Sequence, residues 1–404
     1  MSVVKHAHDI SIGRGLDMNI IIVGIGGHAG SWKKYIEINE NWKLVGVVDT
    51  DTEKLQHSNL WGVPEENAYP SITAAVKFSD DKIDAVLLTT PIPTHHVLVT
   101  EALELGLNVI CEKNMAGSIE QAQAMVKLAR ARPELCTVMG TQYRFRPIWW
   151  TLHELFTTGE SPVGNLAEIR VDSVAKQGTM RTGWRAWLQH IYAEDMMAHH
   201  VDVLRYCTGF EVVKVQAQVF RPWWSQWLGT SSVFCNMVLA PKGRERVKEE
   251  WVYCQYHGDW QGRGIRSNWK DLFEFYGPSG CIRVESPDDP QLPSWEPTPV
   301  MPLAGQPSGS HIVAYMDDAN LNTQVEEVPL REDVEHNPQN HIDQMYILDE
   351  LADCIRSGGE KQPMVNFEEG YKTFIVTHAA IESSKTGRTV WLPRYWLDNR
   401  IPEP

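Results

Sequence analysis

The hydrophobic positions in the first third of the chain form short continuous runs, each followed by a turn and then by a helical pattern. These runs cover residues 20–23, 44–48, 85–90, 108–111 and 135–140. Continuous apolar runs bounded by glycine or proline are typical of strands buried on both faces of a parallel sheet. The helical patterns include residues 95–105 and a segment that starts at Ser118, whose capping box with Gln121 marks a helix start. Strands and helices that alternate over short connections predict a doubly wound α/β domain.

The pattern changes after residue 145. Residues 167–174 alternate between apolar and polar side chains, and most later strand-like segments follow at hairpin spacing. Those segments cover residues 211–220, 231–239, 246–255 and 272–276, and helices are predicted over 195–206, 340–357 and 367–386. We therefore expect a flexible tail at 1–17, a doubly wound parallel domain at 18–145, and an α+β domain at 146–404 with a large, open, mostly antiparallel sheet. The proline-rich residues 286–309 are expected to form an irregular loop.

The composition is typical of a soluble globular protein with more than one domain. The chain has 404 residues, of which 43% are hydrophobic and 22% charged. Its net charge of −15 argues against nucleic acid or an anionic membrane as a partner. Residues 1–17 lack the apolar core of a signal peptide, and no apolar run is long enough to span a bilayer. The seven cysteines are scattered, so we expect reduced thiols and a cytoplasmic location.

A glycine-dense turn after the first strand has the spacing of a dinucleotide-binding fingerprint. The turn reads GIGGHA from Gly24 to Ala29. Gly24 permits the tight turn, Gly26 lets the backbone approach a pyrophosphate, and Ala29 lets the next helix pack on the strand. Free N–H groups at the start of that helix would bind the phosphate oxygens. The turn predicts a dinucleotide-binding Rossmann domain, although glycine turns also close strands that bind nothing.

The second strand ends in Asp49, about 20 residues beyond the glycine turn, where a carboxylate accepts hydrogen bonds from an adenosine ribose. An acid there would also repel a 2′-phosphate, so we expect NAD rather than NADP. Asp51 is the competing acid, and either residue could instead serve only the turn after the strand.

Polar pairs follow three of the buried strands, at the edge of the sheet where open α/β domains bind ligands. They are Thr90–Pro91, Glu112–Lys113 and Thr141–Gln142. Lys113 would have a lowered pKa, because burial and a positively charged nicotinamide both disfavour its ammonium form. It could hold a substrate hydroxyl or relay its proton. A lysine without such neighbours would be interpreted as a solvated surface residue.

Asp195 and His199 lie four residues apart on a predicted helix and so share one face of it. A carboxylate that orients and charges an imidazole makes a general base, suited to removing an alcohol proton while hydride leaves the same carbon. Residues at this spacing can also bind zinc, but no third distant ligand is marked, so we expect no metal. A helix-surface ion pair is the other alternative.

Together these features resemble the glucose–fructose oxidoreductase/inositol dehydrogenase (Gfo/Idh/MocA) family over nearly the whole chain. The resemblance rests on the glycine turn, Thr90–Pro91 with His95, Glu112–Lys113, Tyr143–Arg144–Phe145, the Asp195-x-x-x-His199-x-x-Asp202 helix and the final helices from residue 341. It implies NAD(P)-linked oxidation or reduction of sugars, cyclic polyols and similar alcohols. It also implies that the open C-terminal sheet serves oligomerisation, so we expect a homodimer or homotetramer.

The resemblance implies roles for individual residues. Lys113 would contact the reacting hydroxyl, and His199 would be the acid/base with Asp195 beside it. The residues implied to lie near the substrate are Lys113, Arg144, Trp184, Arg185, Asp195 and His199. Those implied to border the cofactor are Gly24, Gly26, Gly27, His28, Ala29, Asp49, Thr90, Pro91, His95, Glu112 and Lys113.

Two positions depart from the family pattern. Asn114 stands where the family usually has proline after Glu-Lys, and a cis bond before asparagine costs about 3 kcal/mol. We therefore expect no cis bend to aim Lys113. Met197 replaces a usual glycine, and its larger side chain would reshape the substrate pocket or the helix contact.

The leading interpretation is an NAD-dependent dehydrogenase that transfers hydride between a ring carbon of a sugar, glycoside or cyclitol and nicotinamide. One alternative is a redox-assisted glycoside-cleaving enzyme or lyase, which would need an additional base such as Glu194 or His200. Another is a non-enzymatic NAD-dependent sensor, which has no need of Lys113, Asp195 and His199. The sixteen tryptophans could include sugar-stacking platforms, but core and subunit packing would explain most of them.

Overall fold

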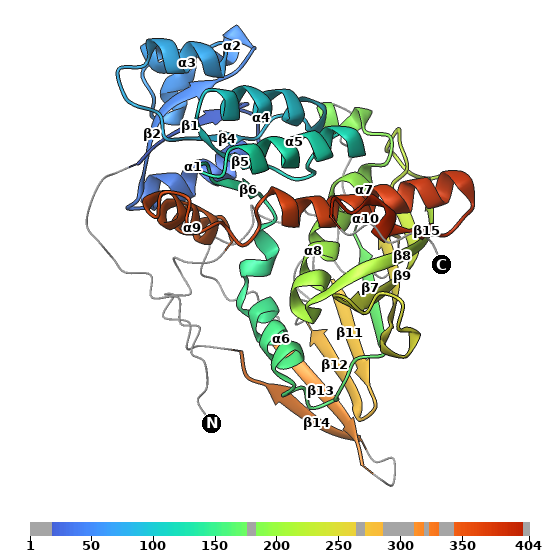
Figure 1. Ribbon diagram of the computed structural model, residues 1–404. Coiled ribbons are helices and arrows are strands. Elements are labelled where there is room, and N and C mark those ends of the chain that lie inside the picture. The colour runs from blue at the N-terminus through green and yellow to red at the C-terminus, as the bar shows by residue number, and fades with distance from the viewer. Residues whose placement is uncertain are drawn as a thin grey trace, which may run out of the picture.

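The computed structural model describes residues 18–175, 183–263, 271–285, 311–318, 323–330 and 343–398. These residues form a six-stranded and a nine-stranded sheet, and the long helix α10 runs between the two (Figure 1). The expected tail at 1–17 and the expected proline-rich loop at 286–309 lie outside the described residues.

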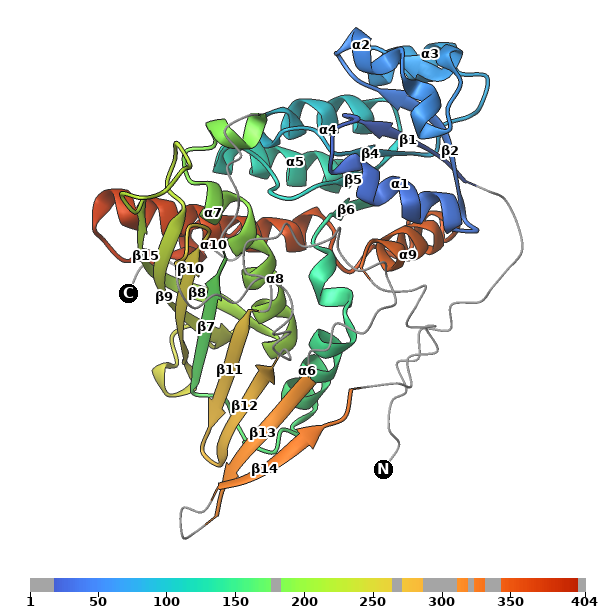
Figure 2. The same cartoon turned by 180° about the vertical axis from the view of Figure 1, so that it is seen from behind.

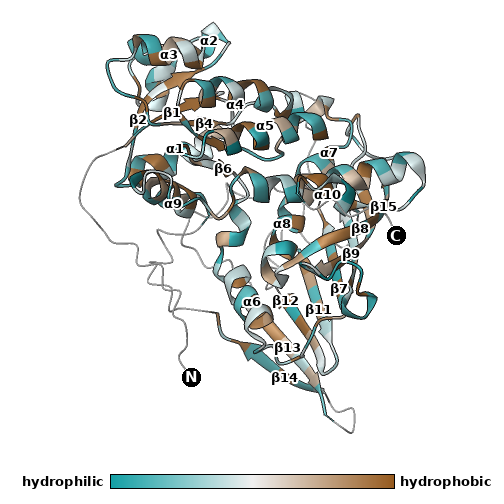
Figure 3. Ribbon diagram, viewed as in Figure 1, coloured by the Kyte–Doolittle hydropathy of each residue, from teal (hydrophilic) through white to brown (hydrophobic). Residues whose placement is uncertain are grey.

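The six-stranded sheet is entirely parallel and confirms the predicted doubly wound domain. Its strands are β1 (Met18–Val23), β2 (Trp42–Val48), β3 (Ala68–Tyr69), β4 (Ala85–Leu88), β5 (Asn108–Cys111) and β6 (Thr137–Met139), in the order β3-β2-β1-β4-β5-β6. The central strands are hydrophobic (Figure 3) because helices cover both faces. The strand order reverses between β1 and β4, and open α/β sheets bind ligands at such a switch point.

The helices of this domain follow the predicted alternation. They are α1 (Ala29–Ile38), α2 (Thr52–Leu55), α3 (Ile72–Phe78), α4 (His95–Glu104) and α5 (Ile119–Ala131). Ser118 caps α5 by accepting a hydrogen bond from the backbone N–H of Gln121 at 3.3 Å, as the sequence predicts.

The nine-stranded sheet is antiparallel except for the parallel pair of β7 and β10, as expected for the second domain. Its strands are β7 (Glu168–Val174), β8 (Phe210–Phe220), β9 (Ser232–Pro241), β10 (Val252–Asp259), β11 (Leu272–Gly277), β12 (Gly280–Glu285), β13 (His311–Asp317), β14 (Thr323–Val328) and β15 (Val390–Trp391). The strand predicted over 246–255 was placed too early, because the charged residues 244–250 form a loop with a short 3-10 turn before β10.

Among the described residues, five helices follow the parallel sheet along the chain. They are α6 (Pro147–Thr158), α7 (Ile191–Glu194), α8 (Met196–Thr208), α9 (Gln344–Arg356) and α10 (Phe367–Thr386). The helix predicted over 195–206 is found as α8, and Asp195 lies at a joint between the short helix α7 and α8. The start of the helix predicted from residue 340 falls partly outside the described residues.

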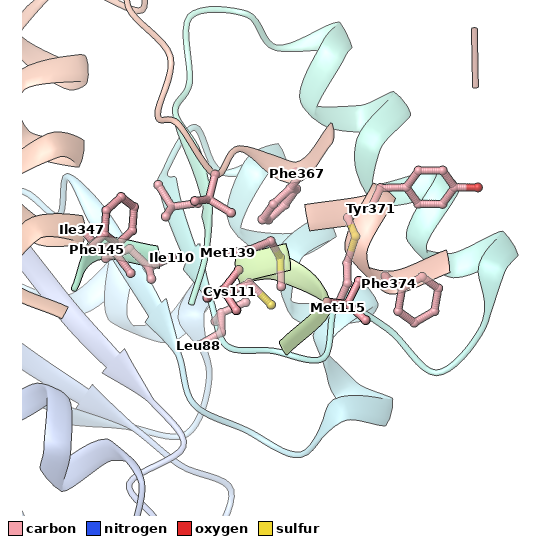
Figure 4. Close-up of a cluster of buried hydrophobic side chains, with 14 of the residues drawn as sticks. Leu88, Ile110, Cys111, Met115, Met139, Phe145, Ile347, Phe367, Tyr371 and Phe374 are labelled. Carbon is pink, nitrogen blue, oxygen red and sulfur yellow. The ribbon is translucent and has the colours of Figure 1, made fainter. Parts of the chain in front are cut away.

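The two sheets share one hydrophobic core that the C-terminal helices complete. Side chains from the ends of β4, β5 and β6 pack with residues of α9 and α10 (Figure 4). The labelled members are Leu88, Ile110, Cys111, Met115, Met139, Phe145, Ile347, Phe367, Tyr371 and Phe374. Helix α9 also bonds to the first domain, since the indole N–H of Trp42 donates to the carbonyl of Leu348 at 2.8 Å. The C-terminal residues therefore hold both domains in fixed register (Figure 2).

The tryptophans among the described residues range from buried to exposed. Several are buried in the core: Trp32, Trp42, Trp149, Trp227, Trp260 and Trp391. Trp187 and Trp223 are 78% and 86% exposed. In the part of the chain that the structure describes, no helix has the length and hydrophobicity needed to cross a membrane.

Candidate active site

The glycine turn between β1 and α1 fits a dinucleotide phosphate. Gly24 has a φ of +87°, and a Cβ there would lie 2.6 Å from Cγ2 of Thr90. A Cβ on Gly26 or Gly27 would meet no atom within 4 Å. The backbone amides of Gly27 and His28 donate to no acceptor among the described residues. The turn is thus an open cradle with free donors at the N-terminus of α1, which suits a pyrophosphate.

Asp49 lies at the end of β2, next to this turn. Its Oδ2 accepts hydrogen bonds from the backbone N–H of Ile25 at 3.1 Å and from Nζ of Lys54 at 3.1 Å. Asp51, the competing acid, instead caps α2 by accepting from the backbone N–H of Glu53 at 3.0 Å. Of the two acids, Asp49 is therefore the one placed beside the cradle.

Glu112, which follows β5, anchors the helix side of the cradle. Its Oε1 accepts from the indole N–H of Trp32 at 2.7 Å and from Nε2 of His28 at 2.9 Å. Burial disfavours the carboxylate, but His28, Lys113 and Trp32 more than compensate and lower the pKa of Glu112 to about 2. Glu112 is therefore a buried anion that positions His28 at the edge of the cofactor site.

His95 joins the loops that follow β4 and β5. It is fully buried, and its two ring nitrogens lie 2.9 Å from the carbonyl oxygens of Thr90 and Asn114. Burial lowers the pKa of His95. The expectation that it borders the cofactor stays a prediction. Pro91, in the loop after β4, is half-buried.

The Lys113–Asn114 peptide is cis, so the prediction against a cis bend was wrong. Local preference was outweighed by the tertiary contacts of Asn114. Its carbonyl oxygen faces His95, its Nδ2 donates to Oγ1 of Thr377 at 3.1 Å, and its Oδ1 accepts from the backbone N–H of Met115 at 3.0 Å.

Lys113 joins the two domains at the candidate site. Its ammonium contacts Oδ1 of Asp195, and Nε of Arg185 donates to Oδ2 of the same carboxylate at 2.9 Å. The side chains of Lys113 and Asp195 are 9% and 8% exposed. Burial lowers the pKa of Lys113 to about 7, Glu112 acts against this, and Arg185 adds to it. A lysine with a pKa near neutrality can exchange a proton under physiological conditions.

The predicted pairing of Asp195 with His199 is wrong. Asp195 lies at the joint before α8, outside the regular helix, and both of its oxygens contact the cations of Lys113 and Arg185. Spacing of four residues would bring the two side chains together only on a continuous helix. The residues that share the carboxylate therefore come from both domains.

His199 is buried within electrostatic reach of Lys113. Nδ1 of His199 is buried and has no hydrogen-bond partner among the described residues. Burial lowers the pKa of His199 well below 6.5, and the charges of Lys113 and His200 lower it further. Its ring stacks on Tyr143, with centroids 4.1 Å apart. This imidazole is therefore neutral, with one nitrogen left unpaired.

Arg144, which is expected near the substrate, is buried in an ion pair. It is 4% exposed, and its Nε donates to Oδ2 of Asp202 at 2.8 Å in a two-point contact. An arginine fork satisfied by one carboxylate has a structural role here, joining the turn after β6 to α8. Trp184 is half-buried, with the guanidinium of Arg185 4.7 Å from its ring. Met197 is fully buried in the core, where it contributes to helix packing.

The two candidates for an additional base are engaged elsewhere. His200 lies 2.8 Å from the hydroxyl of Tyr256 and 3.0 Å from Oδ2 of Asp271, deep beneath the sheet. Glu194 accepts from the backbone N–H of His190 at 2.8 Å. Within the described ranges, no three His, Cys, Asp or Glu side chains are arranged to hold a metal ion.

Sequence reasoning missed the contacts of Tyr143 and the role of Glu112. Tyr143 belongs to the turn after β6, and Arg146 lies one helical step beyond it. An aromatic residue and two arginines directly after a buried strand were a visible signal, but their partners lie on distant helices. Such partners cannot be read from local spacing.

Comparisons with known proteins agree with the fold and with the cradle. The model of the GFO_IDH_MocA oxidoreductase family, NAD-binding Rossmann fold, matches residues 18–139. The chain is 27% identical to inositol 2-dehydrogenase 3 of Saccharopolyspora erythraea over 62% of this chain and 68% of that protein. It is 28% identical to an inositol 2-dehydrogenase of Corynebacterium glutamicum (strain ATCC 13032), but over only 38% of this chain and 43% of that one.

Among solved structures, the aldose-aldose oxidoreductase of Caulobacter crescentus superimposes with a TM-score of 0.71. The match covers 93% of this chain and 100% of that one at 20% identity, which shows that both domains share its fold.

Proposed function

Since this chain belongs, through its Rossmann domain, to the Gfo/Idh/MocA oxidoreductase family, we propose that it is an NAD-dependent oxidoreductase. Its substrate would be a sugar, glycoside or cyclitol, oxidised or reduced at a ring carbon. The names of its relatives support this class, since they include inositol 2-dehydrogenases. One observation carries the proposal: Lys113 at the end of β5 contacts Asp195 of the second domain, next to the cradle that fits a dinucleotide.

The chain's own residues fit the cofactor. The open faces of Gly26 and Gly27 and the free amides of Gly27 and His28 would hold the pyrophosphate. Asp49 would accept hydrogen bonds from the adenosine ribose, which favours NAD over NADP. When bound, the nicotinamide supplies the acceptor or donor for hydride. Thr90 and Pro91 would border it at the end of β4.

Lys113 would transfer the proton of the substrate hydroxyl, and His199 would contact that hydroxyl. With a pKa of about 7, Lys113 is partly neutral near pH 7 and can take the proton of a substrate hydroxyl. Asp195 fixes the position of Nζ and balances its charge when the proton arrives. Nδ1 of His199, unpaired and buried nearby, offers a second polar contact to the hydroxyl. In the reverse direction the ammonium of Lys113 would return the proton.

The alternative of a redox-neutral glycoside-cleaving enzyme has less support. It needs a further base, and both His200 and Glu194 are occupied by other partners. A non-enzymatic sensor would not need the buried contact of Lys113 with Asp195. The fold alone is compatible with a sensor as well as with an enzyme.

We also propose that the outer face of the nine-stranded sheet joins subunits in a homodimer or homotetramer. This face has a hollow of about 690 Å³, lined by residues of β7 to β11 and the end of α10. Phe234 and Tyr253, 50% and 53% exposed, lie on adjacent strands of the sheet.

We also propose a cytoplasmic location. The seven cysteines support it, because all of them are free thiols.

A substrate panel tests the function. The protein is mixed with NAD and monosaccharides, cyclitols or glycosides, and the near-ultraviolet absorbance of reduced nicotinamide is followed while products are analysed. A sustained rise with one substrate class supports the dehydrogenase. Consumption of substrate without a rise supports redox-neutral cleavage, and tight NAD binding with no reaction supports the sensor. Gly26→Val, which fills the cradle, should abolish NAD binding in a calorimetric titration.

A further inference from the structure

Tyr143 is clamped between two side chains that carry or can carry positive charge. Its ring lies 4.1 Å from the imidazole of His199, with 13° between the planes. The guanidinium carbon of Arg146 lies 3.8 Å from the centroid of the same ring. Two groups at such distances cannot share one face of a ring, so Tyr143 separates Arg146 from His199.

The outer end of this stack is fixed by an ion pair. Nε of Arg146 donates to Oδ1 of Asp343 at 2.8 Å, and Asp343 is the residue just before α9. Phe145, two positions after Tyr143, stacks on Tyr346 of α9 with centroids 4.4 Å apart. The turn after β6 is therefore held against α9 by an ionic and an aromatic contact.

His199 lacks the orientation that a carboxylate usually gives a working histidine. Asp195 is shared by Lys113 and Arg185, and Nδ1 of His199 has no described partner. Among the described residues, stacking on Tyr143 is thus the contact that sets the plane of this imidazole. Aromatic pairs stacked in this geometry attract each other beyond the effect of buried area, which favours one ring orientation.

We propose that Tyr143 is a positioning residue for His199, and that Arg146 and Asp343 hold Tyr143 in place from the other side. The inference rests on the proposed function, because it assigns the orientation of His199 to a residue outside the proton-handling set. Tyr143 acts on His199 through its ring face, and a hydrogen bond between its hydroxyl and Arg146 only adds to the contact on the other side.

The electrostatic surroundings agree with this arrangement. The charged and titratable groups that act on His199 are Lys113, His200, Arg146 and His28, and all of them disfavour the imidazolium. The ring of Tyr143 keeps Arg146 close without letting it hydrogen-bond to His199. Removing the ring would open space beside His199, relieve its burial and raise its pKa toward the ordinary value.

The test compares Tyr143→Phe with Tyr143→Leu. Tyr143→Phe keeps the stacked ring and should retain most of the wild-type kcat. Tyr143→Leu should lower kcat by on the order of 10²-fold, as misplacement of a reacting group does, while the Kd for NAD stays unchanged. In both variants the pKa of His199 is followed by NMR of its ring protons, and only Tyr143→Leu should raise it.

The chain offers a matched control at the far end of α8. Tyr206 stacks on His153 with centroids 4.5 Å apart and 7° between planes, outside the candidate site. Tyr206→Leu removes an equivalent stack and should leave kcat and the pKa of His199 at wild-type values. Equal loss of kcat in Tyr143→Leu and Tyr206→Leu would show a general packing effect and overturn the inference. So would an unchanged pKa of His199 in a folded Tyr143→Leu protein.

The NMR readout also separates this inference from the proposed function. If no substrate is turned over by the wild type, the proposed function fails, yet the shift of the His199 pKa still decides whether Tyr143 positions that ring. If turnover occurs and Tyr143→Leu matches Tyr143→Phe, the proposed function stands and the positioning role fails.

Discussion

At the scale of single residues, the main feature of the candidate site is one carboxylate, that of Asp195, which two cations share. Asp195 contacts Lys113 of the first domain and Arg185 of the second. Burial lowers the pKa of Lys113, whereas the carboxylates of Glu112 and of Asp195, which contacts Nζ, favour its charged form. The balance of these two effects sets the fraction of Lys113 that can accept a proton at neutral pH.

Asp195→Asn should therefore shift the pH dependence of catalysis. Removing the carboxylate takes one anion away from the ammonium of Lys113 while Glu112 and Arg185 stay in place, which lowers the pKa of Lys113 below its wild-type value of about 7. The acidic limb of kcat/KM for substrate oxidation should move to lower pH, even if the maximal rate falls. A pH–rate profile measures this, with Asp172→Asn, a surface partner of His257, as the control. A limb that moves to higher pH would contradict this account of Lys113.

The sequence was most informative where chemistry follows from backbone geometry. The glycine turn and Asp49 lie as predicted because short, glycine-specific turns leave few alternative conformations. The ion pair of Arg144 could not be predicted, because its partner Asp202 lies 58 positions away and no local spacing reveals such a pair. The cis bond before Asn114 escaped prediction for the same reason, since the contacts around it come from α4 and α10.

At the scale of elements, Glu112 fastens α1 to the end of β5. Trp32 lies on α1 and His28 just before it, and both donate to this one buried carboxylate. A buried anion with several donors strongly stabilises the arrangement of the elements that supply them. The cradle for the cofactor therefore depends on Glu112 even though a ligand need not touch it.

Glu112→Gln should remove a pH-dependent part of the stability. The pKa of Glu112 is lowered from 4.5 to about 2 on folding, which corresponds to about 3 kcal/mol. Because the folded pKa is depressed, this contribution is fully present above the unfolded pKa. It is lost as the pH falls from about 5 to about 2.

Urea unfolding at several pH values measures this contribution. The free energy of unfolding of wild type minus that of Glu112→Gln should decrease toward acid. Glu101→Gln, on the surface of α4, is the control and should show no such trend. If the difference in the free energy of unfolding between wild type and Glu112→Gln stayed constant from neutral to acidic pH, the proposed role of Glu112 would be ruled out.

Element types were predictable and their ends were not. Five of the six parallel strands were predicted because full burial imposes continuous apolar runs, and the two-residue strand β3 was not. The joint at Asp195 was missed because helical spacing continues on both sides of it. The start of β10 was misplaced because an exposed charged loop and an edge of a half-buried strand have similar composition.

The whole molecule is held together by its C-terminal residues. Helices α9 and α10 return from the second domain and pack on the parallel sheet (Figure 1, Figure 4). No pattern in the sequence marks this return, because an amphipathic helix does not show which surface it will cover. The candidate site lies where the ends of the parallel strands meet α8, and α10 keeps those two parts in register.

Assembly through the nine-stranded sheet predicts the effect of a charge on its outer face. Phe234→Glu should convert the oligomer to monomer, because it places an unpaired charge in a desolvated interface. Phe78→Glu, at the end of α3 and 66% exposed, is the matched control and should leave the assembly unchanged. Light scattering after size-exclusion chromatography gives the mass of each. A wild-type chain that is monomeric at micromolar concentration would refute the proposed interface.

The most direct test of the central claim is the stoichiometry of reduced nicotinamide formed by wild type and by Lys113→Met on the best substrate of the panel. The account predicts one reduced nicotinamide per oxidised ring carbon in wild type. It predicts a rate lower by on the order of 10²-fold or more in Lys113→Met, with NAD binding retained. Substrate consumption without reduced nicotinamide, or a Lys113→Met protein as fast as wild type, would contradict it.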